Sequence, residues 1–126
     1  MNMNIVNKVP FDFDYSKEDD ILTIFDYSKS IKETVEFSEF LNVSIGTDGG
    51  IVGFEIFDAG QFLGALNPSL NKEFLQKLTK VEIEQKEYRN NFFVIIWLHS
   101  NKQVVSQPLP LLNKNTYESP LIASAH

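Results

Sequence analysis

Phe92 to Leu98 read FFVIIWL, an unbroken apolar run that constrains the fold more than any other stretch of the chain. A strand that is apolar on both sides belongs inside a sheet whose two faces are covered. Ile21 to Phe25, ILTIF, has the same two-sided character. The chain has 126 residues with eleven Phe, four Tyr and one Trp, which is enough for one domain with its own core.

Further segments alternate between apolar and polar residues, as strands with one wet face do. Phe11, Phe13 and Tyr15 alternate with Asp12 and Asp14. Thr34–Phe37, Leu41–Ile45, Val81–Gln85 and Gln103–Val105 also have extended character.

Helical spacing is confined to the middle of the chain. Asp58 is a suitable N-cap for a short helix, and Asn67-Pro68 is a suitable cap and first residue for a longer one. Leu70, Phe74 and Leu78 then follow at every fourth position, the apolar stripe of an amphipathic helix.

These segments predict an α+β domain, in which one main amphipathic helix separates two strand meanders of an antiparallel twisted sheet. We expect residues 1–126 to form a single domain. Residues 10–66 would hold the first meander and the short helix, and residues 67–112 the main helix and the second meander. Residues 113–126 would be a loosely held tail.

Residues 44 to 59, SIGTDGGIVGFEIFDA, contain four of the six glycines of the chain. A phosphate loop needs a helix directly after its glycines, whereas a strand pattern follows here. Asp48-Gly49 therefore predicts a type I′ hairpin turn, with Gly50 as a bulge. Gly53 lies within the following strand, where we expect an aromatic ring such as Phe62 or Phe74 to pack over it. The alternative is a ligand bound there, beside Glu55.

Composition excludes or disfavours several classes of function. The chain has no Cys, a net charge of -6 and a single Arg, so thiolate chemistry is excluded and nucleic-acid binding is not expected. The sequence shows no membrane-spanning run and no secretory signal, which predicts a cytoplasmic protein that binds no membrane. The acidic balance favours a basic protein as partner.

No catalytic, metal or cofactor site emerges from the residue spacing. Two distant histidines, His99 and His126, do not form a zinc pattern, and the acids from Asp12 onward lack the glycine of a calcium loop. His99 is expected at the end of its strand, near Trp97. Glu18-Asp19-Asp20 is typical of a solvated, acidic surface.

Residues 15–59 resemble a small prokaryotic domain family of unknown function. The resemblance rests on Tyr15–Ile24 (Y-x-x-E-x-D-x-L-x-I), on Glu33–Glu36 (E-T-V-E), and on Asp48–Ala59, which fits D-G-x-I-V-G-x-E-I-x-D-A. It implies an antiparallel meander closed by a helix after Asp58-Ala59, and no catalytic residues. Some relatives are suspected partners of small toxins, which implies an antitoxin-like role as an alternative.

Taken together, the residues predict a non-enzymatic interaction module that forms a homodimer through its two-sided apolar strands. Two alternatives are a small-ligand binder or enzyme with a site near Gly53 and Glu55, and a partner for a small basic toxin. The candidate ligand or interface residues are Gly53, Glu55, Trp97 and His99.

Overall fold

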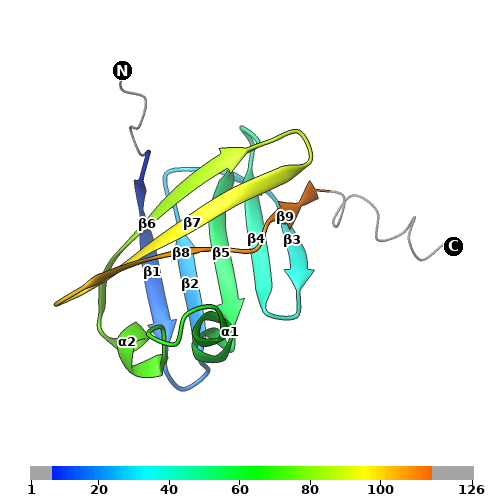
Figure 1. The fold of residues 1–126 in the computed structure, drawn as a ribbon. Helices are drawn as coiled ribbons and strands as arrows, with labels where there is room; N and C mark the ends of the chain where they lie inside the picture. The colour runs from blue at the N-terminus through cyan, green and yellow to red at the C-terminus, as the bar shows by residue number, and fades with distance from the viewer. Residues whose placement is uncertain (1–6, 115–126) are drawn as a thin grey trace, which may run out of the picture.

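A computed structural model describes residues 7–114. Within this range the chain forms nine strands and two short helices (Figure 1). The strands are β1 (Val9–Ser16), β2 (Ile21–Phe25), β3 (Ile31–Ser38), β4 (Leu41–Gly46), β5 (Ile51–Phe57), β6 (Leu78–Glu87), β7 (Asn91–Ser100), β8 (Val104–Pro108) and β9 (Leu112–Asn113). The helices are α1 (Ala59–Leu66) and α2 (Lys72–Gln76).

All of the strand pairs are antiparallel, in the order β3-β4-β5-β2-β1-β6-β7-β8, with β9 also pairing with β7. The strand β1 is shared, because Asp12–Ser16 pair with β2 whereas Val9–Phe11 pair with β6. The sheet therefore curls over at β1 like half of a barrel, and β6, β7 and β8 cross the strands β1 to β5 (Figure 1). We call β1 to β5 the first layer and β6 to β9 the second layer.

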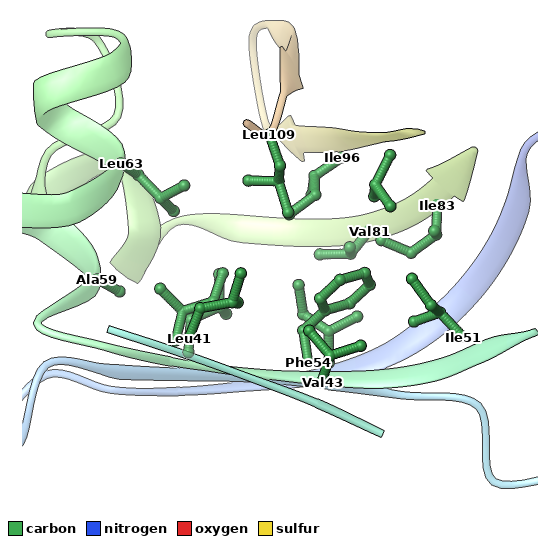
Figure 2. Close-up of a cluster of buried hydrophobic side chains, with 14 of the residues drawn as sticks. Leu41, Val43, Ile51, Phe54, Ala59, Leu63, Val81, Ile83, Ile96 and Leu109 are labelled. Carbon is green, nitrogen blue, oxygen red and sulfur yellow. The ribbon is translucent and has the colours of Figure 1, made fainter. Parts of the chain in front are cut away.

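The hydrophobic core fills the space between the two layers. Leu41, Val43, Ile51 and Phe54 point from the first layer toward Val81, Ile83, Ile96 and Leu109 of the second, and Leu63 of α1 closes one end (Figure 2). Each of these side chains is at most 5% exposed. The two strands that the sequence predicted as apolar on both sides, β2 and β7, thus bury one side in a common core, and their other side is only half-buried.

The predicted α+β class with one main helix is wrong. The helix expected from Asn67-Pro68 onward is only the five-residue α2, and Leu78 already belongs to β6, where it pairs with Ser100. Asn67 forms a turn, accepting a hydrogen bond from Ser69 N at 3.0 Å, while Asn71 caps α2 by accepting one from Phe74 N at 2.9 Å. The fourfold spacing ending at Leu78 was misleading, because a strand residue at its end also packs against the core, here with a partly buried side chain.

The hairpin between β4 and β5 is confirmed, but its turn differs from the predicted type I′. Gly49 has a φ of 92°, and Asp48 does not have positive φ. The Gly49 amide donates to Gly46 O at 3.0 Å, and the Gly46 amide donates to Gly50 O at 2.8 Å. This is a three-residue loop in which Gly49 forms the bulge, so the positive φ falls on one glycine alone.

The C-terminal prediction is covered only in part. Asn113 pairs with Asn91 in the strand β9, and the predicted loose tail from residue 115 to residue 126, with His126, lies outside the described residues. Within residues 7–114, neither helix is long and apolar enough to cross a membrane.

Candidate functional site

The side of β7 that faces away from the core carries Phe93, Ile95, Trp97 and His99. All four are half-buried, while the alternate residues Phe92, Val94, Ile96 and Leu98 are buried in the core. We call this surface the β7 face, and it includes the flanking outward residues of the neighbouring strands. These are Lys80, Glu82, Glu84 and Lys86 of β6 and Val104, Ser106 and Pro108 of β8, together with Lys8, whose ammonium lies over the Trp97 ring.

Register places a charged residue of β6 directly opposite each outward residue of β7. Lys86 lies opposite Phe93 and Glu84 opposite Ile95. Glu82 lies opposite Trp97 and Lys80 opposite His99. On the other side β8 places no charged residue opposite them. The β7 face is therefore an apolar stripe with charges of both signs along one side.

The indole ring of Trp97 is fixed by two polar contacts. Its Nε1 donates a hydrogen bond to Glu84 Oε1 at 3.1 Å. The Lys8 ammonium lies 4.1 Å from the ring centroid, within the range of a cation–π interaction. Trp97 is the single Trp of the chain. Its ring is thus contacted by groups from β6 and from the segment before β1.

His99 forms a short polar contact with Glu82 on the β7 face. Its Nε2 lies 2.7 Å from Glu82 Oε1, and Lys80 Nζ lies 3.7 Å from Glu82 Oε2. Burial by itself would raise the pKa of Glu82, but the hydrogen bond from His99 and the charges of Lys80 and Lys8 outweigh it. The pKa of the Glu82 carboxyl therefore lies below its ordinary value, and Glu82 stays ionised near neutral pH.

Gly53 and Glu55 lie on a different surface, the outward side of the first layer. The residue opposite Gly53 in β2 is Phe25, and a Cβ on Gly53 would lie 3.2 Å from the Phe25 ring. The predicted covering ring is thus Phe25, not Phe62 or Phe74. Glu55 is half-buried, with Asn42 Nδ2 at 3.5 Å from its Oε1. The four candidate residues form two pairs on opposite outer surfaces, and the fold does not bring the pairs together.

Asp20 has a structural role, the capping of α1, that could not be predicted from the sequence. It is 7% exposed, with φ of 55°, although its segment reads as a solvated acidic surface. Its carboxylate accepts hydrogen bonds from Tyr15 Oη at 2.6 Å and from the Gly60 amide at 2.9 Å. Asp58, the predicted cap of α1, makes no side-chain cap. Asp20 takes over that role from forty residues away, and no local pattern signals such a partner.

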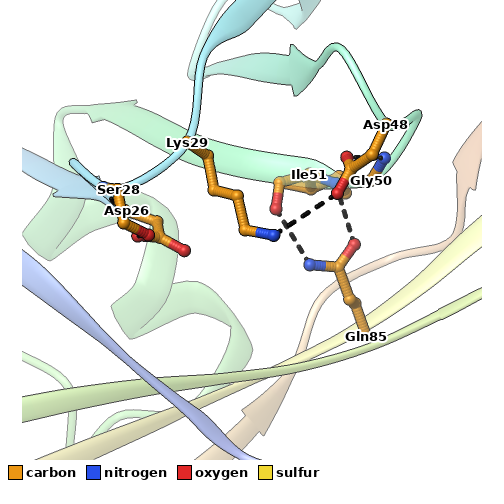
Figure 3. Close-up of polar contacts among 7 residues, drawn as sticks. All are labelled: Asp26, Ser28, Lys29, Asp48, Gly50, Ile51 and Gln85. Atoms are coloured by element: carbon orange, nitrogen blue, oxygen red, sulfur yellow. Dashed lines mark hydrogen bonds and ion pairs between the residues drawn. The ribbon is translucent and has the colours of Figure 1, made fainter.

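A second polar cluster joins the two layers beside the β4–β5 turn (Figure 3). Gln85 Oε1 accepts from Ile51 N and Gln85 Nε2 donates to Ile51 O, both at 2.9 Å. Asp48 pairs with Lys29 at 3.5 Å. The hydrogen bond from the Gly50 amide, and then the Lys29 ammonium, hold the pKa of Asp48 below its ordinary value despite some desolvation.

The cluster beside the turn acts as a connection between strands. The side-chain amide of Gln85 in β6 forms the same pair of hydrogen bonds with Ile51 that a neighbouring strand would form. It can do so because a side-chain amide has the same donor and acceptor as a peptide group. Among residues 7–114, no group of three or more His, Cys, Asp or Glu side chains is placed to hold a metal ion.

The fold and the β7 face define a protein built on a curled antiparallel sheet, with an apolar stripe on its outer surface. Residues 12–59 match the family described as Protein of unknown function (DUF2283). The predicted resemblance to a domain family of unknown function is thereby confirmed. The matched segment coincides with the first layer, from Asp12, the first residue of β1 to pair with β2, to Ala59 at the start of α1. No curated protein and no solved structure matches the chain.

Proposed function

We propose that this protein is a non-enzymatic interaction module, and that a second copy of the chain binds the β7 face. The observation that carries the proposal is the outward stripe of Phe93, Ile95 and Trp97 on a central strand. Neither helix packs over this stripe, since both lie at one end of the curled sheet (Figure 1). Contiguous apolar surface of this kind on a folded chain is typical of a protein–protein interface.

The charges favour a second copy over an unrelated partner. A chain with a net charge of -6 repels its own copies, unless they meet on a surface where that charge is offset. The β7 face supplies such a surface, with Lys8, Lys80 and Lys86 against Glu82 and Glu84. Because both signs lie beside the same stripe, two copies related by a twofold axis can place unlike charges opposite each other.

The outward side of the first layer lacks this balance. It carries four carboxylates, which belong to Asp12, Asp14, Glu36 and Glu55. Two such surfaces would repel each other on approach. This difference in charge supports the second layer, and not the first, as the surface for homotypic association.

Sedimentation velocity from about 1 to 100 µM tests the proposal, since this range covers ordinary homodimer affinities. We expect a concentration-dependent dimer for the native chain, and monomer for Ile95→Lys, which puts a charge in the centre of the stripe. Thr23→Lys is the matched control, because Thr23 is half-buried on the outward side of β2 in the first layer. A native chain that stays monomeric throughout, or equal loss in both variants, contradicts the proposal. Far-UV circular dichroism verifies that both variants are folded.

A basic protein is the second candidate partner, and it would bind the first layer. In register, Asp14, Thr23, Glu55, Asn42 and Glu36 form one row across all five strands. Such a row suits a partner that presents lysines or arginines. Association should then weaken steeply with added salt and be lost in Glu36→Lys with Glu55→Lys, while Ile95→Lys leaves it unchanged. Binding that is insensitive to these two changes counts against this candidate.

A further inference from the structure

We infer that pH controls the homotypic association, and that His99 is the group that responds. The inference rests on the proposed function, because it concerns the same β7 face. His99 lies one outward position beyond Trp97 on β7, so a copy that covers the stripe also covers the imidazole. Histidine ordinarily changes charge between pH 5 and pH 8, which makes it the natural switch on such a surface.

The groups around His99 come from each of the elements packed against it. From β6, Glu82 is hydrogen-bonded to Nε2 at 2.7 Å, and Lys80 lies opposite in register. From β8, the residue opposite is the uncharged Val104. From the segment before β1, Lys8 lies over the neighbouring Trp97. The imidazole thus has one anionic neighbour, and that neighbour is already paired with a lysine.

Charge balance decides the direction of the response. With His99 neutral, Lys80 balances Glu82, and the whole β7 face carries three lysines against two glutamates. A proton on His99 leaves the Glu82 hydrogen bond in place and adds a positive charge that no further carboxylate of this group offsets. Each copy would bring that charge into a desolvated interface where the other copy carries the same charge.

Linkage then fixes the sign of the pH dependence. On a face that already carries three lysines against two glutamates, a further positive charge on each copy opposes association of the two faces. Association therefore releases protons, and by linkage it becomes tighter as the pH rises. Glu82 remains ionised over this range, so its charge is constant while that of His99 changes.

The test measures the dimer dissociation constant at about pH 7.5 and about pH 5.8, which bracket ordinary histidine titration. Both values lie above the isoelectric point of about 4.8, so the chain keeps a net negative charge. We expect the dissociation constant of the native chain to rise roughly tenfold or more at the lower pH, as two histidines per dimer take up protons. His99→Gln keeps a donor for Glu82 and should give the same constant at both values.

His126→Gln is the matched control, since His126 is the second histidine of the chain and the inference assigns the response to His99 of the β7 face. This variant should keep the full pH dependence. The emission of Trp97, the single Trp, reports burial of the face in the same samples. A constant that is equal at both pH values, that falls at the lower one, or that varies as much in His99→Gln overturns the inference while leaving association intact. A chain that is monomeric at both pH values overturns the proposed function, and this inference with it.

Discussion

The Asp20 carboxylate and the Gly60 amide are joined by hydrogen bonds of 2.9 and 3.2 Å, although forty residues separate them. The Asp20 carbonyl also accepts from the Ala59 amide at 2.9 Å, so one residue receives two of the free amides at the start of α1. The negative charge also lies at the positive end of the helix dipole. This contact fixes α1 to the turn between β1 and β2, and Leu63 of α1 thereby reaches the core.

Asp20→Ala should lower the free energy of unfolding by about 2 to 3 kcal/mol, because it removes a buried cap and leaves the Tyr15 hydroxyl without its acceptor. Asp20→Asn should cost less, since an amide oxygen can accept the same bonds and Asn tolerates positive φ. Urea denaturation measures both. The neighbouring Asp19→Ala is the control and should stay within about 0.5 kcal/mol of the native chain. An equal effect at both positions would show that Asp20 has no special role.

Tyr15→Phe should make stability less sensitive to alkaline pH. Burial, followed by the hydrogen bond to Asp20 and the charge of Asp20, raises the pKa of Tyr15 well above its ordinary value. The stabilisation from a raised pKa is fully present below about pH 10, the ordinary tyrosine value, and declines as the pH rises above it. Urea midpoints at about pH 8 and about pH 10.5 should therefore differ more for the native chain than for the variant. Identical differences would contradict this account.

Gln85→Ala should reduce stability by about 1 to 2 kcal/mol, since it removes two hydrogen bonds and leaves the Ile51 amide and carbonyl without this partner. Hydrogen exchange should become faster at the Ile51 amide in particular. Gln61→Ala on the exposed side of α1 is the control, and should alter neither quantity. Unchanged exchange at Ile51 in Gln85→Ala would mean that the connection between the layers does not depend on this side chain.

Gly53→Ala and Gly50→Ala form a matched pair within one hairpin. A Cβ at Gly53 would lie 3.2 Å from both the Ile24 carbonyl oxygen and the Phe25 ring, and the backbone oxygen cannot move away. At Gly50 the nearest atoms are side-chain oxygens at 3.6 and 3.7 Å, and φ is not positive. We expect Gly53→Ala to cost about 1 to 3 kcal/mol and Gly50→Ala to be neutral or slightly stabilising. Thermal unfolding of the two variants measures the difference, and a reversed order would refute the packing argument.

The elements that could be predicted from the sequence were those that depend on residues close together in the chain. The apolar runs Ile21–Phe25 and Phe92–Leu98 located two strands of the core, since a short run of apolar residues is itself typical of a strand. Asp48-Gly49 located a hairpin, although the single positive φ at Gly49 gave a different turn. The antiparallel sheet followed from these elements.

What could not be predicted depends on partners distant in the chain. The end of α2 was missed because Leu78 pairs with Ser100, and the sequence does not show this pairing. Asp20 was assigned to a wet surface and Gln85 only to a strand, yet the two side chains bond to Gly60 and to Ile51 across the fold. Among the candidate residues, Trp97 and His99 lie together on β7, whereas Gly53 and Glu55 lie on the outward side of the first layer, and the sequence does not show this separation.

The division of β1 between the two layers has a mechanical consequence. Phe11 pairs with Val81 and the next residue, Asp12, pairs with Phe25, so one uninterrupted strand carries hydrogen bonds into both halves of the molecule. The two layers also share a single core. Neither layer can unfold without breaking backbone hydrogen bonds of the other. The chain should accordingly melt as one cooperative unit, even though the family match covers residues 12–59 alone.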